Sequence, residues 1–167
     1  NNMATDNFKH LVLTHYGSMY RVAYSILRDS DDAQDAVQDA VAAIWAKRSM
    51  LSDIDNYESF CVKAVKNRCI DMIRARASRK DSAMSLPEDA ENPVNPVTEL
   101  EARDTLSLVK SLVNRLPPLQ QEVLRLRSEA GCDLQEIAAI TGVTHDNART
   151  LLSRARRRLK DLYNNIK

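Results

Sequence analysis

Hydrophobic residues recur every three or four positions along the first half of the chain, which is the period of an α-helix. Three such segments follow one another, over about residues 6–28, then to about 48, then about 56–78. The acidic cluster at residues 29–32 offers capping side chains for the start of the second segment. We therefore predict three amphipathic helices. Their apolar positions are Phe8, Leu11, Val12, Tyr16, Met19, Tyr20, Ala23 and Leu27; then Ala33, Val37, Ala40, Val41, Ile44 and Trp45; then Phe60, Cys61, Ala64, Val65, Cys69, Met72 and Ile73.

The second and third predicted helices differ in the charge of their polar faces. The second shows carboxylate and amide groups to solvent, whereas the third is basic on the side opposite its apolar residues. For the acidic face of the second helix, an ordinary solvated surface is the simplest interpretation. The residues concerned are Asp35, Gln38 and Asp39 in the second helix, and Lys63, Lys66, Asn67 and Arg74 in the third.

An acidic, proline-containing segment separates the two halves of the chain. Residues 80–105 hold 2 Lys or Arg against 7 Asp or Glu, and they include Pro87, Pro93 and Pro96. Proline removes a backbone donor and disfavours helix in the residue before it. We therefore predict that residues 80–97 form an extended or disordered linker. On this basis residues 3–79 and 98–167 form two small helical domains.

The second half predicts four more helices. The first covers about residues 98–115, and Pro118 suits the first position of the next, which runs to about residue 129. A capping box of Asp133 and Glu136 then starts a short helix. Gly142 suits a left-handed turn, and Thr144 suits the N-cap of a last helix. The apolar stripe of that helix is Ala148, Leu151, Leu152, Ala155, Leu159 and Leu162.

A short helix, a tight turn with glycine and a longer helix form the helix-turn-helix layout, whose second helix enters the DNA major groove. Between Arg149 and Lys160 the last helix holds 6 basic side chains and no acidic one. Arginine binds guanine edges or phosphates, and small hydroxyl residues allow close approach to the bases. A solvated face would more often interleave Glu with Arg. Opposite the apolar stripe lie Asp146, Arg149, Thr150, Ser153, Arg154 and Arg157, while Arg156, Arg158 and Lys160 are better placed for phosphates.

Composition narrows the class of protein. Three glycines, two phenylalanines and abundant Ala, Leu, Arg, Glu and Asp favour an all-α protein. Its expected architecture is an N-terminal bundle of three to four helices and a C-terminal four-helix domain with a helix-turn-helix. The three cysteines contain no C-x-x-C pair, which suits a reducing compartment. No apolar run approaches the ~20 residues of a membrane span and no signal-peptide layout is present, so we expect a cytoplasmic protein.

One long stretch and two shorter ones resemble the extracytoplasmic-function class of bacterial RNA polymerase sigma factors. LPPLQQEVLRLRSEAGCDLQEIAAITGVTHDNARTLLSRARRRL, residues 116–159, resembles the family's C-terminal domain. DAQDAVQDAVAAIW, residues 32–45, is similar to its polymerase-docking helix, and FCVKAVKNRCIDMIRAR, residues 60–76, to the helix that opens the promoter. One departure lies at residues 144–148, which read THDNA where many relatives have S-x-G-T-V.

This resemblance implies partners and residue roles. Asp35, Gln38 and Asp39 would dock on the β′ clamp helices of core RNA polymerase, whose β flap would bind the C-terminal domain. Lys63, Lys66 and Arg74 would follow the phosphates of the −10 element, and Asn67 would recognise an unstacked base. Arg149, Thr150, Ser153, Arg154 and Arg157 would bind the −35 element. An anti-sigma factor, membrane-bound for many relatives, is a further implied partner.

Other classes of protein remain alternatives. A conventional helix-turn-helix regulator would share residues 116–160 but would carry a sensor pocket or a dimer surface in its first half. A pure interaction module would not need the arginine-rich face. Enzymatic motifs are absent, since His10, His15 and His145 do not have metal-ligand spacing and no HExxH, GxSxG or glycine phosphate loop occurs. We therefore expect no catalysis, no cofactor, no metal and no small-molecule substrate.

Overall fold

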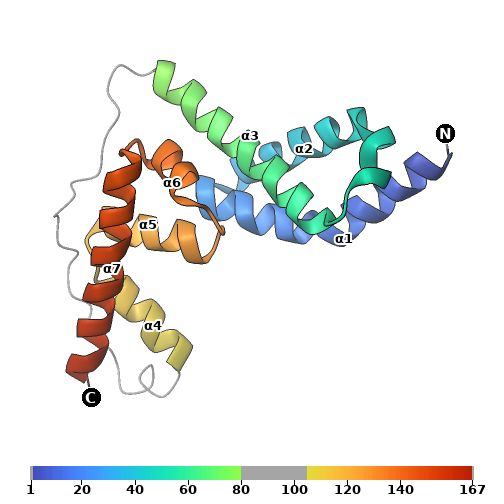
Figure 1. Ribbon diagram of the computed structural model, residues 1–167. Helices are drawn as coiled ribbons and strands as arrows, with labels where there is room; N and C mark the ends of the chain where they lie inside the picture. The colour runs from blue at the N-terminus through green and yellow to red at the C-terminus, as the bar shows by residue number, and fades with distance from the viewer. Residues whose placement is uncertain (1, 80–104, 167) are drawn as a thin grey trace. The chain divides into compact units, whose positions relative to one another are not determined.

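The computed structural model describes residues 2–79 and 105–166, and every regular element in these two ranges is a helix (Figure 1). The described residues fall into two compact units, the first with α1 to α3 and the second with α4 to α7. The all-α prediction with two helical domains is thereby confirmed. The predicted linker at residues 80–97 and the predicted helix start at residue 98 lie outside the described residues.

The first unit consists of α1 (Asn2–Leu27), α2 (Ser30–Ala46), the 3₁₀ helix η1 (Arg48–Asp53) and α3 (Tyr57–Arg79). Helix α1 starts earlier than the predicted residue 6 and ends before Arg28, which has a positive φ of 56°. Asp29 caps α2 by accepting a hydrogen bond from the backbone N–H of Asp32 at 2.9 Å. The predicted second helix was too long, because the chain tightens into η1 after residue 46.

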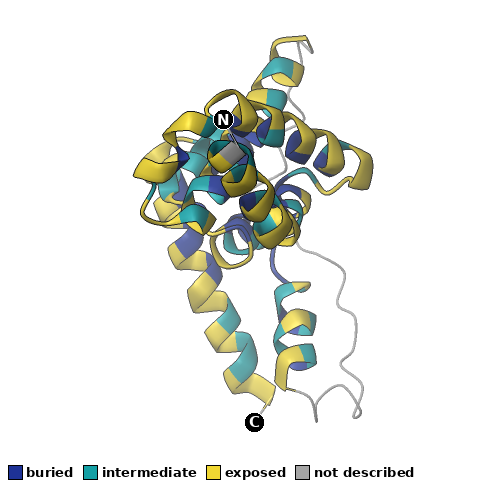
Figure 2. Cartoon of the chain, turned by 90° about the vertical axis from the view of Figure 1, so that its right-hand side faces the viewer, coloured by how far each residue is buried: buried dark blue, intermediate teal, exposed yellow. Residues whose placement is uncertain are grey.

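Helices α2 and α3 pack against α1 and against each other, and η1 packs against α1. Buried and exposed residues alternate along the turns (Figure 2). The predicted core differs from the observed one in several places. Tyr16 and Trp45 were assigned to the core but are 37 % and 39 % exposed, and buried residues such as Ile26 and Ile70 were not assigned to it. Four predicted core positions of α3 are only half-buried, namely Phe60, Ala64, Met72 and Ile73.

The second unit consists of α4 (Thr105–Val113), α5 (Pro118–Ser128), α6 (Leu134–Thr141) and α7 (His145–Ile166). Helix α6 starts at the predicted capping box, in which Asp133 accepts from the N–H of Glu136 at 2.8 Å and the Glu136 carboxylate accepts from the N–H of Asp133 at 2.9 Å. It ends at Gly142, whose φ of 82° lies in the left-handed region that glycine adopts without strain. The short helix and the turn predicted from the sequence are therefore confirmed.

Helix α7 packs its apolar stripe on α4, α5 and α6. The first four positions of the predicted stripe are buried, whereas Leu159 and Leu162 farther along are half-buried. Burying one side of a helix fixes which side faces solvent. Packing against three helices therefore holds α7 as a rigid element with its polar side exposed. The buried stripe residues are Ala148, Leu151, Leu152 and Ala155.

Candidate nucleic-acid interface

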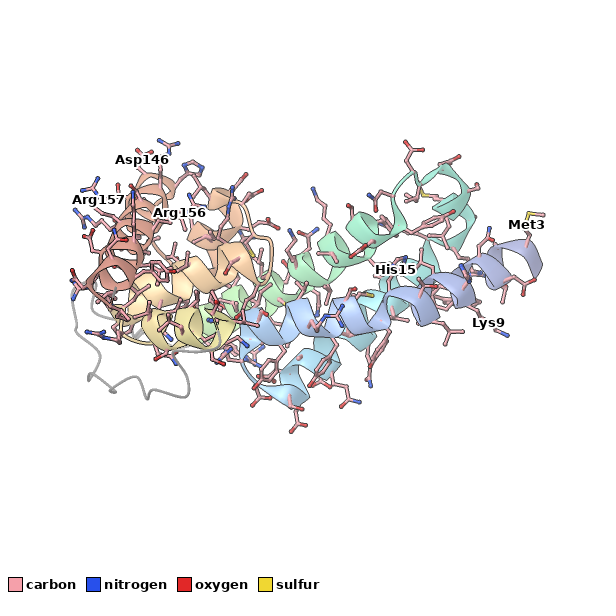
Figure 3. All side chains as sticks on the ribbon, turned by 90° about the horizontal axis from the view of Figure 1, so that it is seen from below. Met3, Lys9, His15, Asp146, Arg156 and Arg157 are labelled. Carbon is pink, nitrogen blue, oxygen red and sulfur yellow. The ribbon has the colours of Figure 1, made fainter. Side chains whose placement is uncertain are left out.

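The exposed side of α7 carries the residues that were predicted from the sequence to contact duplex DNA. A helix turns by roughly 100° per residue, so positions opposite the leucine and alanine stripe form one surface. Figure 3 shows Asp146, Arg156 and Arg157 on this helix. Guanidinium and hydroxyl groups therefore lie together on the exposed face of one helix. Each of the predicted contact residues is exposed, namely Arg149, Thr150, Ser153, Arg154 and Arg157.

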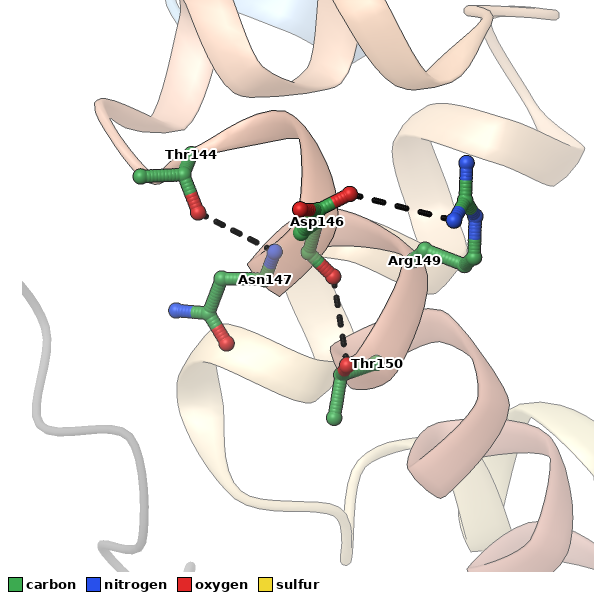
Figure 4. A network of polar contacts seen from close by, with 5 residues as sticks. All are labelled: Thr144, Asp146, Asn147, Arg149 and Thr150. Atoms are coloured by element: carbon green, nitrogen blue, oxygen red, sulfur yellow. Dashed lines mark hydrogen bonds and ion pairs between the residues drawn. The ribbon is translucent and has the colours of Figure 1, made fainter.

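A network of polar contacts organises the first turn of α7 (Figure 4). The Thr144 hydroxyl accepts from the backbone N–H of Asn147 at 3.1 Å, which confirms Thr144 as the cap. The Asp146 Oδ1 lies 3.8 Å from a terminal nitrogen of Arg149. The Thr150 hydroxyl donates to the backbone carbonyl of Asp146 at 3.1 Å. Arg149 and Thr150, two of the predicted DNA contacts, thus interact with Asp146, which lies in the segment that departs from the family pattern.

Three arginines gather around one hollow of the second unit. The hollow has a volume of about 280 Å³ and lies where α5, the start of α6 and α7 meet. Arg127 was not predicted from the sequence as a site residue. Its position in the basic last turn of α5, just before the helix-turn-helix, could have indicated it. Its guanidinium donates to the carbonyl of Cys132 at 3.1 Å, which fixes it beside the turn. The lining residues are Arg127, Leu134, Arg149, Leu152, Ser153 and Arg156.

In the first unit, the basic residues of α3 do not all share one face. Lys63, Asn67 and Arg74 are exposed and lie within roughly 40° of one another around the helix axis. Lys66 is half-buried and lies on a different side of the helix. The structure therefore brings three of the four predicted −10 residues together and sets Lys66 apart from them.

Helix α2 exposes Asp35, Gln38 and Asp39, as predicted. Asp39 also binds the neighbouring helix, since its Oδ2 accepts from the Nε of Arg68 at 2.9 Å. Asp39 therefore belongs both to the predicted docking face of α2 and to the contact between α2 and α3.

A second ion pair joins the same two helices. Arg76 on α3 lies 2.9 Å from Asp32 on α2. The hydrogen bond to Asp32 raises the pKa of the Arg76 guanidinium above its usual value. Two cross-helix pairs therefore connect the acidic helix with the basic one.

Within residues 2–79 and 105–166, no three His, Cys, Asp or Glu side chains are grouped so that they could hold a metal ion. Cys61, Cys69 and Cys132 are buried and form no disulfide with one another, and burial raises the pKa of the Cys61 thiol to about 11. Among the described helices, none contains an apolar stretch of the length that a membrane span requires.

Comparison with known proteins gives the same two-part layout. Residues 11–79 match the family described as Sigma-70 region 2, and residues 106–159 match Sigma-70, region 4. The RNA polymerase sigma-E factor of Streptomyces coelicolor is 27 % identical over 154 residues, which cover 92 % of this chain and 84 % of that protein. The ECF RNA polymerase sigma factor SigM of Mycobacterium tuberculosis H37Rv is 27 % identical over 156 residues, which cover 93 % of this chain and 76 % of that protein.

A solved structure shares the fold. The sigma factor RpoE of Bartonella quintana, crystallised with the anti-sigma factor NepR, superposes with a TM-score of 0.50 at 24 % identity, covering 94 % of this chain and 96 % of the RpoE chain. The region 2 match identifies the first unit, which decides against a conventional regulator with a sensor domain. Matches to both regions, together covering more than half of the sequence, show that the chain belongs to the sigma-70 family and is an extracytoplasmic-function sigma factor, a promoter-recognition subunit for RNA polymerase.

Proposed function

We propose that the two units divide promoter recognition between them, with α7 binding the −35 element, α3 binding the −10 element and α2 docking on core polymerase. The observation that carries this division is the separation of charge among three helices. The exposed face of α7 is rich in arginine, α3 exposes basic groups, and α2 exposes acidic groups. No single partner complements all three faces, whereas DNA suits the first two and a basic protein surface suits the third.

For α7, the supporting feature is the combination of long donors with small residues. Arg149 and Arg154 reach guanine edges in the major groove, and Thr150 and Ser153 allow the helix to approach. Arg127 and Arg156 lie at the edge of the hollow beside this face and suit backbone phosphates, which set the register of a protein on DNA. Arg157 continues the same face toward the end of the helix. Some residues would therefore determine which base sequence is bound, and others would add affinity for any DNA.

For α3, the proposal concerns single-stranded DNA. Asn67 lies between Lys63 and Arg74 on one exposed face, so an amide that pairs with a base edge is flanked by cations that attract phosphates. Binding an unstacked base repays the cost of unpairing it, so a protein without ATP hydrolysis can favour an open duplex. Lys66 lies to one side of this face and would add a further positive charge for the phosphates.

For α2, the exposed Asp35, Gln38 and Asp39 suit the β′ clamp helices of core polymerase. The domain limits that we propose are residues 3–79 for docking and −10 recognition, 80–97 for the linker, and 98–167 for −35 recognition and contact with the β flap. The protein would act in the cytoplasm, where core polymerase works, and it would supply binding without catalysis.

An anti-sigma factor is the further partner that we propose. The related RpoE was crystallised with the anti-sigma factor NepR. The acidic docking face and the basic DNA faces are exposed in the described residues, so an inhibitor could occupy either kind of surface.

Tethered DNA cleavage tests the proposed division of labour. All three native thiols are buried, so a cysteine introduced at an exposed position is labelled selectively with an iron chelate. His145→Cys places the chelate at the start of α7, and Asp71→Cys places it on α3; both positions are exposed. In holoenzyme on promoter DNA, we expect cleavage near −35 from the first variant and near −10 from the second. Cleavage at one common place, or in the reverse order, would refute the assignment.

A further inference from the structure

Asp146 lies at the centre of the face that α7 presents to DNA. Residues 7 and 11 positions farther along a helix return to within roughly 20° of the starting direction, so Asp146 shares one row with Ser153 and Arg157. Its side chain is 92 % exposed. The first turn of a recognition helix is also the part that contacts base edges. Asp146 therefore occupies a base-reading position, although it carries the charge that phosphates repel.

A carboxylate in that position has few favourable contacts on DNA. It accepts hydrogen bonds and donates none, so it cannot pair with the O6 and N7 acceptors of guanine or with the O4 of thymine. Two bases present an amine in the major groove, adenine through N6 and cytosine through N4. The N7 acceptor beside adenine N6 would repel a carboxylate, whereas Asp or Glu is the usual acceptor for cytosine N4. A contact with N4 would offset the repulsion by neighbouring phosphates.

The neighbouring arginine completes a matched pair of groups. A terminal nitrogen of Arg149 lies 3.8 Å from Oδ1 of Asp146. The hydrogen bond from Thr150 to the Asp146 carbonyl also adds a contact within this first turn. The Asp146 carboxylate, which accepts hydrogen bonds, thus lies beside the Arg149 guanidinium, which can donate two at once. A C·G pair presents the complementary set in the major groove, with the N4 donor of cytosine next to O6 and N7 of guanine.

We propose that Asp146 and Arg149 together select one C·G base pair in the −35 element, Asp146 by accepting from cytosine N4 and Arg149 by donating to guanine. This inference rests on the proposed binding of −35 DNA by α7. Asp146 is thus a specificity-determining residue, and the departure of residues 144–148 from the family pattern changes which sequence is bound. Removing the carboxylate should alter the preference at one base pair, whereas simple repulsion would act on every sequence alike.

Selection from a duplex library with a randomised −35 segment tests the proposal, using holoenzyme made with wild-type protein or with variants. The wild type should enrich C·G at one position. Asp146→Ala should reduce that preference by about tenfold and leave the other positions unchanged. Asp146→Asn offers an acceptor and a donor suited to adenine, so the preference should shift toward A·T. Asp161→Asn removes a negative charge from an exposed site on the same helix and should keep the wild-type profile.

The possible results separate this inference from the function on which it rests. If the wild-type holoenzyme enriches no −35 sequence, the proposed role of α7 fails and the inference fails with it. If the wild type enriches a sequence and Asp146→Ala gives the same profile, or binds all sequences uniformly better, the role of α7 stands and Asp146 does not read a base. Melting curves of the variants exclude misfolding as the cause of a changed profile.

Discussion

Arg68 on α3 donates through Nε to Oδ2 of Asp39 on α2 at 2.9 Å, so a residue proposed to dock on polymerase also holds the helix proposed to bind the −10 element. Both side chains remain about half exposed, at 43 % and 52 %. Ion pairs of this kind contribute at most about 1 kcal/mol to stability. Substituting Asp39 therefore disturbs two functions, whereas Asp35 is exposed on the same helix and provides a cleaner test of docking.

Asp35→Arg should weaken binding to core polymerase by more than about tenfold, because a like charge would face the basic partner. Fluorescence anisotropy with labelled protein and purified core enzyme measures this affinity. Asp39→Arg should weaken it as well and should also lower the melting temperature, since it places a cation beside Arg68. Arg68→Ala and Asp6→Arg are the controls, and both should bind core normally. Unchanged affinity of Asp35→Arg would remove α2 from the docking surface.

Asn67→Ala should impair promoter opening while leaving the association of holoenzyme with the −35 duplex intact. The amide is proposed to contact only an unstacked base, so its loss matters after the strands separate. Permanganate reactivity of thymines near −10 measures opening, and a mobility shift on closed duplex measures association. A template with a pre-opened −10 region should largely restore transcription. An equal loss in both assays would contradict a role specific to opening.

Arg149→Ala and Arg156→Ala should weaken DNA binding in different ways. The first should cost roughly 1–3 kcal/mol at the base pair it contacts and little elsewhere. The second should weaken binding about equally for all sequences and lower the salt-dependence slope by about 1, because one phosphate contact is lost. Titrations of holoenzyme with matched and mismatched −35 duplexes at several salt concentrations distinguish the two. Lys110→Ala, an exposed position on α4, should change neither quantity.

The sequence predicted the helical segments well, because they depend on local periodicity and capping. The capping box at Asp133, the turn at Gly142 and the stripe beginning at Ala148 all depend on neighbours within a few residues. Local patterns could not predict η1, nor the exposure of Trp45, whose ring lies under the guanidinium of Arg48 at 3.9 Å.

Contacts between helices were less predictable than the helices themselves. The Arg68–Asp39 pair joins residues 29 positions apart and depends on how α2 packs against α3. The hollow lined by Arg127, Arg149 and Arg156 likewise requires α5 and α7 to pack side by side. The candidate contact residues on α7 could be named from the sequence because one buried stripe determines the exposed side. The residues that position them could not be named, because they come from other helices.

Burial of Cys61 predicts a loss of stability at alkaline pH. The pKa of this thiol is raised from 9.0 to about 11 by burial in the folded protein. Between these values the unfolded chain releases the proton and the folded chain keeps it, so the free energy of unfolding falls as pH rises, by about 2–3 kcal/mol in total. Denaturant titrations from pH 8 to about 11 measure it. Cys61→Ala should show a shallower decline than the wild type, and parallel curves would contradict the shift.

Run-off transcription measures whether this protein directs initiation by core RNA polymerase. Core RNA polymerase is supplied with this protein and a genomic promoter library, and the 5′ ends of the transcripts are mapped. We expect discrete start sites that depend on the protein and that share one sequence near −35 and another near −10. If the protein binds DNA by itself and core polymerase supplied with it starts at no such sites, its assignment as a promoter-recognition subunit is contradicted.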